Sequence, residues 1–131
     1  MEARNRSLND WFTRIRTRQL VLPRFQRFEA WTHRHVAGLL DTVLRELPAG
    51  ALLVLEIGNE EPFFSRSMAG APETGDRITE HLLDGQQRLT ALWRSLTNDY
   101  PDRTYFVQMT SQDEDEKRKG VKSALDSWID F

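Results

Sequence analysis

Short apolar runs alternate along this chain with longer stretches of helical periodicity, and this alternation most constrains the possible folds. The clearest helix is predicted from Thr32 to Leu47, where apolar residues recur every three or four positions until Pro48 interrupts them. Other helices are predicted over residues 7–18, after Gly85 and after Ser111, and short strands over residues 20–22, 51–57, 80–83 and 103–109. Interleaved strands and helices predict an α+β or α/β domain with a small mixed sheet.

Burial is expected at several places in this pattern. Residues 51–57 are short, apolar and followed by glycine, so they are expected to form a buried strand. Residues 58–79 show no periodicity, and connections of this length are often functional. Phe25 and Phe28 are expected to lie mostly in the core. Trp31 is expected there too, but it is also a candidate base-stacking side chain because it lies beside the motif described below.

The last part of the chain is expected to be helical. Ser111 and Glu114 have the spacing of a capping box. The predicted helix would share one apolar face among Val121, Leu125, Trp128 and Ile129. Because the chain stops on this face at Phe131, we expect the domain to be truncated at its C-terminus.

Composition excludes several kinds of site. There is no cysteine among the 131 residues, so disulfide bonds, thiolate catalysis and cysteine-ligated zinc are impossible. The net charge of -2 argues against a wholly basic surface for nucleic acid, although arginines concentrate near the N-terminus. No apolar run approaches the length of a membrane span. We therefore expect residues 1–131 to form a single cytoplasmic domain with no membrane partner.

The segment Asp84–Arg88, with the sequence DGQQR, joins a predicted strand to a predicted helix. The first N–H groups of a helix have no internal partners and attract anions, above all phosphates. Gly85 allows the backbone to approach such a ligand, because glycine has no Cβ. Further donors are the amides of Gln86 and Gln87, the planar guanidinium of Arg88 and the hydroxyl of Thr90.

A second reading of this segment is that Asp84 and Gln87 form a capping box and do no more than begin the helix. From spacing alone the two readings are equally supported. Gln26 and Arg27 favour the first, because they also lie between a predicted strand and a predicted helix. Two Gln-Arg pairs at such junctions can converge on one ligand at the same edge of a sheet.

Together, LPRFQRFEAW (residues 22–31) and HLLDGQQRLTALW (residues 81–93) resemble the N-terminal domain of GmrSD-type modification-dependent restriction endonucleases. The first motif of that family has a proline, an aromatic residue, Gln-Arg, a second aromatic residue and a tryptophan. Its second motif is Asp-Gly-Gln-Gln-Arg followed by Leu-Thr. Both motifs occur here in the family's order, and the resemblance covers about residues 8–110.

The resemblance implies an α+β fold like that of the ParB and sulfiredoxin nucleotide-binding domains, with a small mixed sheet flanked by helices. It also implies binding and hydrolysis of a nucleoside triphosphate with Mg²⁺. In this family the hydrolysis is linked to cleavage or sensing of modified foreign DNA, as in defence against phage. DNA is therefore an expected partner, through the full-length protein or a partner nuclease.

The same resemblance implies roles for individual residues. The residues implied in nucleotide binding are Gln26, Arg27, Gly85, Gln86, Arg88 and Thr90. Those implied in catalysis are Asp84, Gln86, Gln87 and Arg88. Arg27 and Arg88 would hold phosphate charge, and Gln86 or Gln87 would orient a phosphate or the attacking water. Asp84 would bind Mg²⁺ or act as a general base.

One departure from the family concerns the nuclease. Many members continue into an HNH-type nuclease region that this chain does not contain, so a missing region or a partner is expected to cleave DNA. The three histidines are expected to be surface residues at His33 and His35 and a structural residue at His81. Two alternatives remain: a non-catalytic DNA-binding or protein-interaction module, and a ParB-like nuclease domain that acts on DNA itself.

Overall fold

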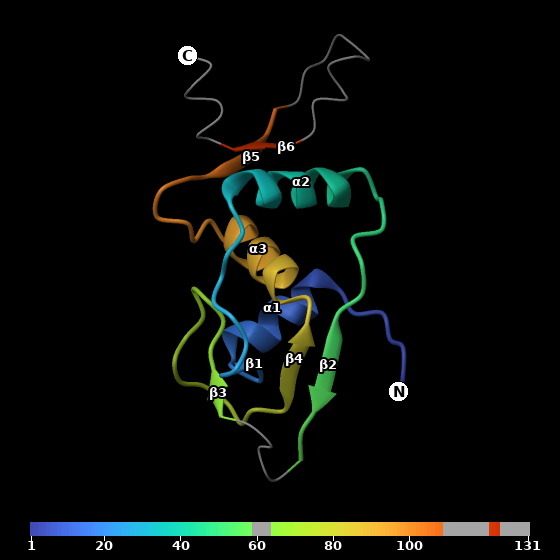
Figure 1. The fold of residues 1–131 in the computed structure, drawn as a ribbon, viewed down its shortest axis with the longest axis vertical. Helices are drawn as coiled ribbons and strands as arrows, with labels where there is room; N and C mark the ends of the chain where they lie inside the picture. Colours follow the sequence, from blue (N-terminus) through green and yellow to red (C-terminus); the bar gives the residue numbers. More distant parts are fainter. Residues whose placement is uncertain (59–63, 109–120, 124–131) are drawn as a thin grey trace. The chain divides into compact units, whose positions relative to one another are not determined.

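The computed structural model describes residues 1–58, 64–108 and, for the backbone, 121–123. The chain divides into two compact units, drawn as one ribbon in Figure 1. The first unit contains residues 1–28 and 52–86, and the second contains residues 29–51 and 87–131. Among the described residues, no helix is long and apolar enough to cross a membrane.

The first unit is built on a four-stranded mixed sheet and one helix, as the alternating pattern predicts. Its strands are β1 (Leu20–Pro23), β2 (Leu53–Glu56), β3 (Ser65–Arg66) and β4 (Glu80–Asp84), and its helix is α1 (Leu8–Arg16). The strand order is β2-β4-β1-β3. β1 runs parallel to β4, whereas β2 is antiparallel to β4 and β3 is antiparallel to β1. The mixed α+β character of the prediction is confirmed.

Helix α1 forms where its capping residue and apolar spacing predict it. The Ser7 side chain accepts a hydrogen bond from the backbone N–H of Asp10, so the first turn is capped. Phe12 and Ile15 lie on one face and are buried, and α1 lies against the fully buried strand β1. This packing places the apolar face of the helix on the sheet.

Strand β2 lies at an edge of the sheet, and the prediction that it is buried is wrong. Its two end residues are exposed and its two central residues are half-buried, and Leu53 is among the exposed large apolar side chains. An edge strand has a neighbour on one side only, so apolar residues alone do not guarantee its burial.

Glu80, at the start of β4, joins the N-terminal segment and α1 to the sheet. Its carboxylate is almost fully buried and accepts two hydrogen bonds from the Arg6 guanidinium, at 3.0 and 2.9 Å. Arg14 of α1 donates a third bond, from Nη1, at 3.0 Å. Arg6 also stacks on the Trp11 ring, with its Cζ 4.4 Å from the ring centroid. Part of the N-terminal arginine excess is thus neutralised inside the first unit.

The second unit packs helices α2 (His33–Leu44) and α3 (Gln86–Leu96), of which α3 begins at the last residue of the first unit. Val36, Leu39 and Leu40 of α2 are buried in one cluster with Ala91 of α3. The strands β5 (Tyr105–Val107) and β6 (Val121–Ser123) form an antiparallel pair, and β6 lies beside α2 (Figure 1).

Two predictions about this unit are wrong. Helix α2 ends at Leu44 instead of Leu47, because Glu46 adopts a positive φ of 58° and the backbone N–H of Leu47 bonds back to Thr42. This is a Schellman ending, made here without glycine. Val121 lies in strand β6 rather than in a helix, since pairing with β5 overrides its helical spacing. The rest of that predicted helix lies outside the described residues.

Replacing Glu80 with glutamine tests the buried ion cluster. Glu80→Gln is expected to lower the free energy of unfolding by about 3 kcal/mol, the lower end of the cost of breaking a buried ion pair, because both arginines keep some access to water. Urea denaturation measures the change. The matched control is Glu56→Gln, since Glu56 is the exposed partner of Glu80 across β2 and β4. An equal loss in both variants would contradict the role given to Glu80.

Candidate functional site

The junction between β4 and α3 is the place where the DGQQR segment turns from strand to helix. Asp84 is the last residue of β4 and is exposed, and α3 begins two residues later at Gln86. Between them Gly85 has a φ of +92°, in the left-handed region that side chains with a Cβ rarely adopt. The sharp entry into the helix therefore depends on glycine at this position.

Two glutamine side chains tie the first motif to this junction inside the first unit. Nε2 of Gln26 donates to the backbone carbonyls of Leu82 and Leu83, at 2.9 and 2.8 Å. In the opposite direction, Nε2 of Gln86 donates to the carbonyl of Arg27, at 2.7 Å. The two motifs are therefore interlocked by reciprocal bonds from side-chain amides to backbone carbonyls.

The bond of Gln26 to Leu82 takes the place of one that Pro23 cannot make. The parallel pairing of β1 with β4 is recorded at Leu20 and Val21. Pro23 ends β1 and has no N–H with which to continue a ladder. A buried carbonyl without a donor is costly, and the Gln26 amide supplies the donor for Leu82 and bonds the next carbonyl, of Leu83, as well.

Arg66 of β3 also binds the loop that contains Gln26 and Arg27. Its Nη2 donates to the carbonyls of Gln26 and Arg27, at 3.3 and 2.8 Å, and its Cζ lies 4.8 Å from the centroid of the Phe28 ring. Burial lowers the pKa of the Arg66 guanidinium. The sequence analysis missed this residue, because it lies in an aperiodic stretch, 39 residues from its Arg27 partner.

The side chains of this loop are largely exposed. Phe25 and Phe28 keep 69% and 78% of their surface, so the expectation that they lie in the core is wrong. The loop is a turn fixed by backbone contacts, and its aromatic side chains are not required to pack inward. Arg27 is also exposed, which keeps its guanidinium accessible to solvent beside the interlocked backbone.

Within the second unit, Gln87 and Arg88 also bind backbone groups. Oε1 of Gln87 accepts a hydrogen bond from the N–H of Ala30, at 2.9 Å. Nη1 of Arg88 donates to the carbonyl of Ala49, at 3.0 Å. Gly50, with a φ of +96°, lies so close that an added Cβ would be 2.1 Å from Arg88 Nη1.

Thr90 lies one turn further along α3. It is fully buried, and its Oγ1 has no hydrogen-bond partner in the described part of the chain. A hydroxyl left in this state is costly, and a bound group that reached it would gain a hydrogen bond.

The structure thus distributes the predicted site residues over both units. Gln26 and Gln86 are brought to the same loop in the first unit. The meeting of Arg27 with Arg88 stays a prediction, since they belong to different units. Among the described residues, no three histidine or acidic side chains are grouped to hold a metal. An ion at Asp84 would accordingly take most of its ligands from water and phosphate, which is usual for Mg²⁺.

Two of the histidines have contacts that suit structural roles. His81 is fully buried in β4 and its Nε2 lies 2.7 Å from Oγ of Ser65, which fits the structural role expected of it. His35 is exposed, and its Nδ1 accepts a hydrogen bond from the N–H of Thr32 at the start of α2, at 3.3 Å.

Comparison with known proteins gives one family and one relative. The profile of the GmrSD restriction endonuclease N-terminal domain matches residues 8–129. The protein MJ0686 of Methanocaldococcus jannaschii is 31% identical over 118 residues, a match that covers 80% of this chain and 20% of the relative. The chain thus spans about one fifth of the length of that relative. No solved structure matches the chain.

A double-mutant cycle tests the contact between Arg88 and Gly50. Gly50→Ala is expected to destabilise the protein by more than about 1 kcal/mol, because the methyl group meets Arg88 and the positive φ is strained. In an Arg88→Ala background the added cost should be smaller, since only the backbone strain remains. Thermal or urea unfolding measures both.

The control is Gly38→Ala in α2, where an added Cβ would meet no atom within 4 Å. That variant should be neutral or stabilising. The same Gly50→Ala penalty with and without Arg88 would show that the guanidinium does not occupy this position in solution.

Proposed function

Because this chain belongs to the family of GmrSD restriction endonuclease N-terminal domains, we propose that its β4–α3 junction binds a nucleoside triphosphate with Mg²⁺ and hydrolyses it. Hydrolysis would be coupled to cleavage or sensing of modified DNA by the other parts of a restriction system. The proposal assigns DNA cleavage to another region of a longer protein or to a partner nuclease.

The observation that carries the proposal is the interlocking of the two motifs. Gln26 and Gln86 hold the Arg27 loop against the start of α3 with three bonds of 2.7–2.9 Å. The backbone of an exposed arginine is thereby bound to Gln86, the first residue of α3, and the N–H groups and dipole at a helix N-terminus favour an anion. A loop held in this way loses little entropy when a phosphate binds.

Each residue then has a defined task. Arg27 donates to phosphate oxygens, and the first N–H groups of α3 stabilise the same charge. Asp84, exposed at the end of β4, holds Mg²⁺ or takes a proton from the attacking water. The amides of Gln26 and Gln86 position the loop, because their Nε2 atoms already donate to the backbone.

Arg88 is assigned to phosphate by the same proposal. Its Nη1 donates to the carbonyl of Ala49, so phosphate binding would compete with a backbone partner. That competition makes Arg88 a candidate for sensing the γ-phosphate, since a charged ligand forms the stronger bond. Gln87 would then orient the attacking water from the position before Arg88 on α3.

Removing the Arg27 guanidinium tests nucleotide binding. In calorimetric titration of the chain with non-hydrolysable triphosphate analogues and Mg²⁺, Arg27→Ala is expected to weaken binding by about ten- to a hundredfold, the value of one or two charge-assisted bonds. Arg16→Ala is the matched control, because Arg16 is an exposed arginine at the end of α1. Equal affinities in both variants would remove Arg27 from the site.

Replacing Asp84 with asparagine separates binding from turnover. Asp84→Asn should keep measurable triphosphate binding and lose about a hundredfold or more of phosphate release, because neither metal binding nor proton transfer survives. Phosphate release over time measures turnover. Salt-dependent DNA binding without any nucleotide binding would instead support the non-catalytic alternative.

A further inference from the structure

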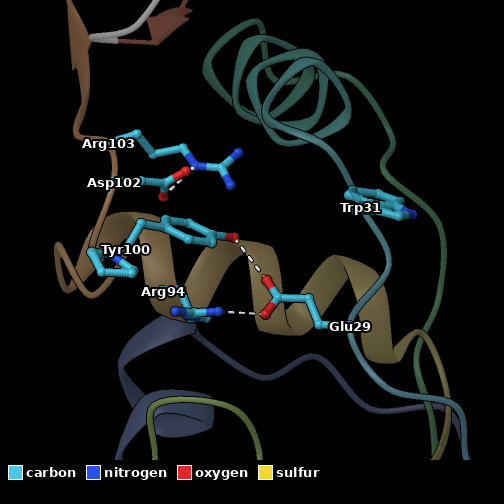
Figure 2. A pocket seen from close by; sticks show the side chains of 7 residues that line it. Glu29, Trp31, Arg94, Tyr100, Asp102 and Arg103 are labelled. Carbon is cyan, nitrogen blue, oxygen red and sulfur yellow. Dashed lines mark hydrogen bonds and ion pairs between the residues drawn. The ribbon is translucent and has the colours of Figure 1, made fainter.

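A pocket of about 330 Å³ lies wholly within the second unit and uses no residue of the β4–α3 junction. It opens between the segment that precedes α2 and the segment that follows α3 (Figure 2). Its lining includes Glu29, Trp31, Arg94, Tyr100, Asp102 and Arg103. The volume is at the low end for ligand pockets and suits one flat ring system.

The floor of the pocket carries a neutralised carboxylate. Glu29 accepts hydrogen bonds from Arg94 and from the Tyr100 hydroxyl, the latter at 3.2 Å. Burial raises the pKa of that hydroxyl, and the negative charge of Glu29 raises it further. Tyr100 is therefore a neutral donor at physiological pH, and the floor does not repel a polar, uncharged ligand.

One wall of the pocket is a stack of planar groups. The Tyr100 ring lies between two guanidinium groups in Figure 2, with Cζ of Arg94 at 4.4 Å and Cζ of Arg103 at 4.9 Å from its centroid. Arg103 is held further by Nε, which donates to Asp102 at 3.1 Å, and by Nη1, which donates to the Tyr105 hydroxyl at 3.4 Å. The plane of this guanidinium is thus fixed before any ligand arrives.

The remaining nitrogen of Arg103 is the one that a ligand can use. Its Nη2 has no hydrogen-bond partner among the residues that the structure describes. Figure 2 shows the terminal nitrogens of Arg103 on the side of the pocket that faces Trp31. The pocket therefore offers oriented N–H donors on one wall and an indole on the other.

We propose that this pocket binds a purine base, with guanine preferred over adenine. The base would stack on Trp31, because an indole offers a flat aromatic surface to a planar ring. Nη2 of Arg103 would donate to O6 of guanine, which is an acceptor. Adenine has an amino donor in place of O6, so two hydrogen-bond donors would face each other and no bond would form.

This inference does not rest on the triphosphate proposal. The base can come from a free nucleotide or from an unpaired position in nucleic acid, and the recognition chemistry is the same in both cases. Guanosine carries no phosphate and probes the pocket alone. Inorganic tripolyphosphate carries no base and probes the junction alone. Because each ligand tests one site, a negative result at one site does not bear on the other.

The test is calorimetric titration of the chain with guanosine and with adenosine. Guanosine is expected to bind about tenfold or more tightly than adenosine, because only guanine offers an acceptor at position 6 for the charged donor. Arg103→Lys keeps the charge but removes the planar fork, and should reduce guanosine affinity by a similar factor. Arg45→Lys is its control, since Arg45 caps α2 with an ion pair to Asp41 outside the pocket.

Trp31→Leu should also weaken guanosine binding by about tenfold or more, by loss of stacking, whereas Trp11→Leu in the first unit should not change it. Thermal unfolding checks that each variant folds. The same titrations with short single-stranded oligonucleotides of guanine or thymine distinguish the two sources of the base. Preferential binding of guanosine over adenosine supports the proposal if Arg103→Lys abolishes that preference. Preferential binding of the guanine oligonucleotide over the thymine oligonucleotide, even where free guanosine does not bind, supports it on the same condition. Absence of both, or a preference that survives Arg103→Lys, overturns it.

Discussion

A proline at the end of a buried strand sets the geometry on which the candidate site depends. Pro23 closes β1 without an N–H for the carbonyl of Leu82, and the last carbonyls of β4 take donors from elsewhere. Gln26 supplies them from a loop three residues further on. This loop also contains Arg27. The same hydrogen bonds that give the β4 carbonyls their donors therefore hold the backbone of an exposed arginine. Stability and candidate function therefore share the same bonds.

The motif residues act through one common device, a side chain bound to the backbone of a distant loop. Gln26 and Gln86 do so in the first unit, and Gln87 and Arg88 do so in the second. A single bond of this kind contributes about 1 kcal/mol, but leaving a buried partner unsatisfied costs more. This asymmetry explains why amides and a guanidinium recur in the two motifs. A shorter or apolar side chain would leave a backbone N–H or carbonyl without a hydrogen-bond partner.

The elements that the sequence predicts well are those decided by local spacing. Helix α1 has its own cap at Ser7 and its own apolar face, and the strand–glycine–helix order around Gly85 can be read from adjacent residues. Burial of β2, the exposure of Phe25 and the strand at Val121 depend on which segments become neighbours. The spacing of apolar residues within a segment does not indicate which other segments will become its neighbours.

The second-unit pocket illustrates the same limit. Its floor pairs Glu29 with Arg94, which are 65 residues apart, and its wall combines Tyr100 with arginines on either side of it in the sequence. Arginine and tyrosine after a helix are common on solvated surfaces. Only the fold shows that these residues line one cavity.

The most direct test of the account is the affinity for inorganic tripolyphosphate of Gln26→Leu, Gln86→Leu and the double variant. If the two amides hold one loop, each single variant should lose most of the affinity, and the double variant should lose little more than either. Single variants that fold and bind tripolyphosphate as tightly as the parent chain would contradict the claim that the interlocked motifs form the anion site.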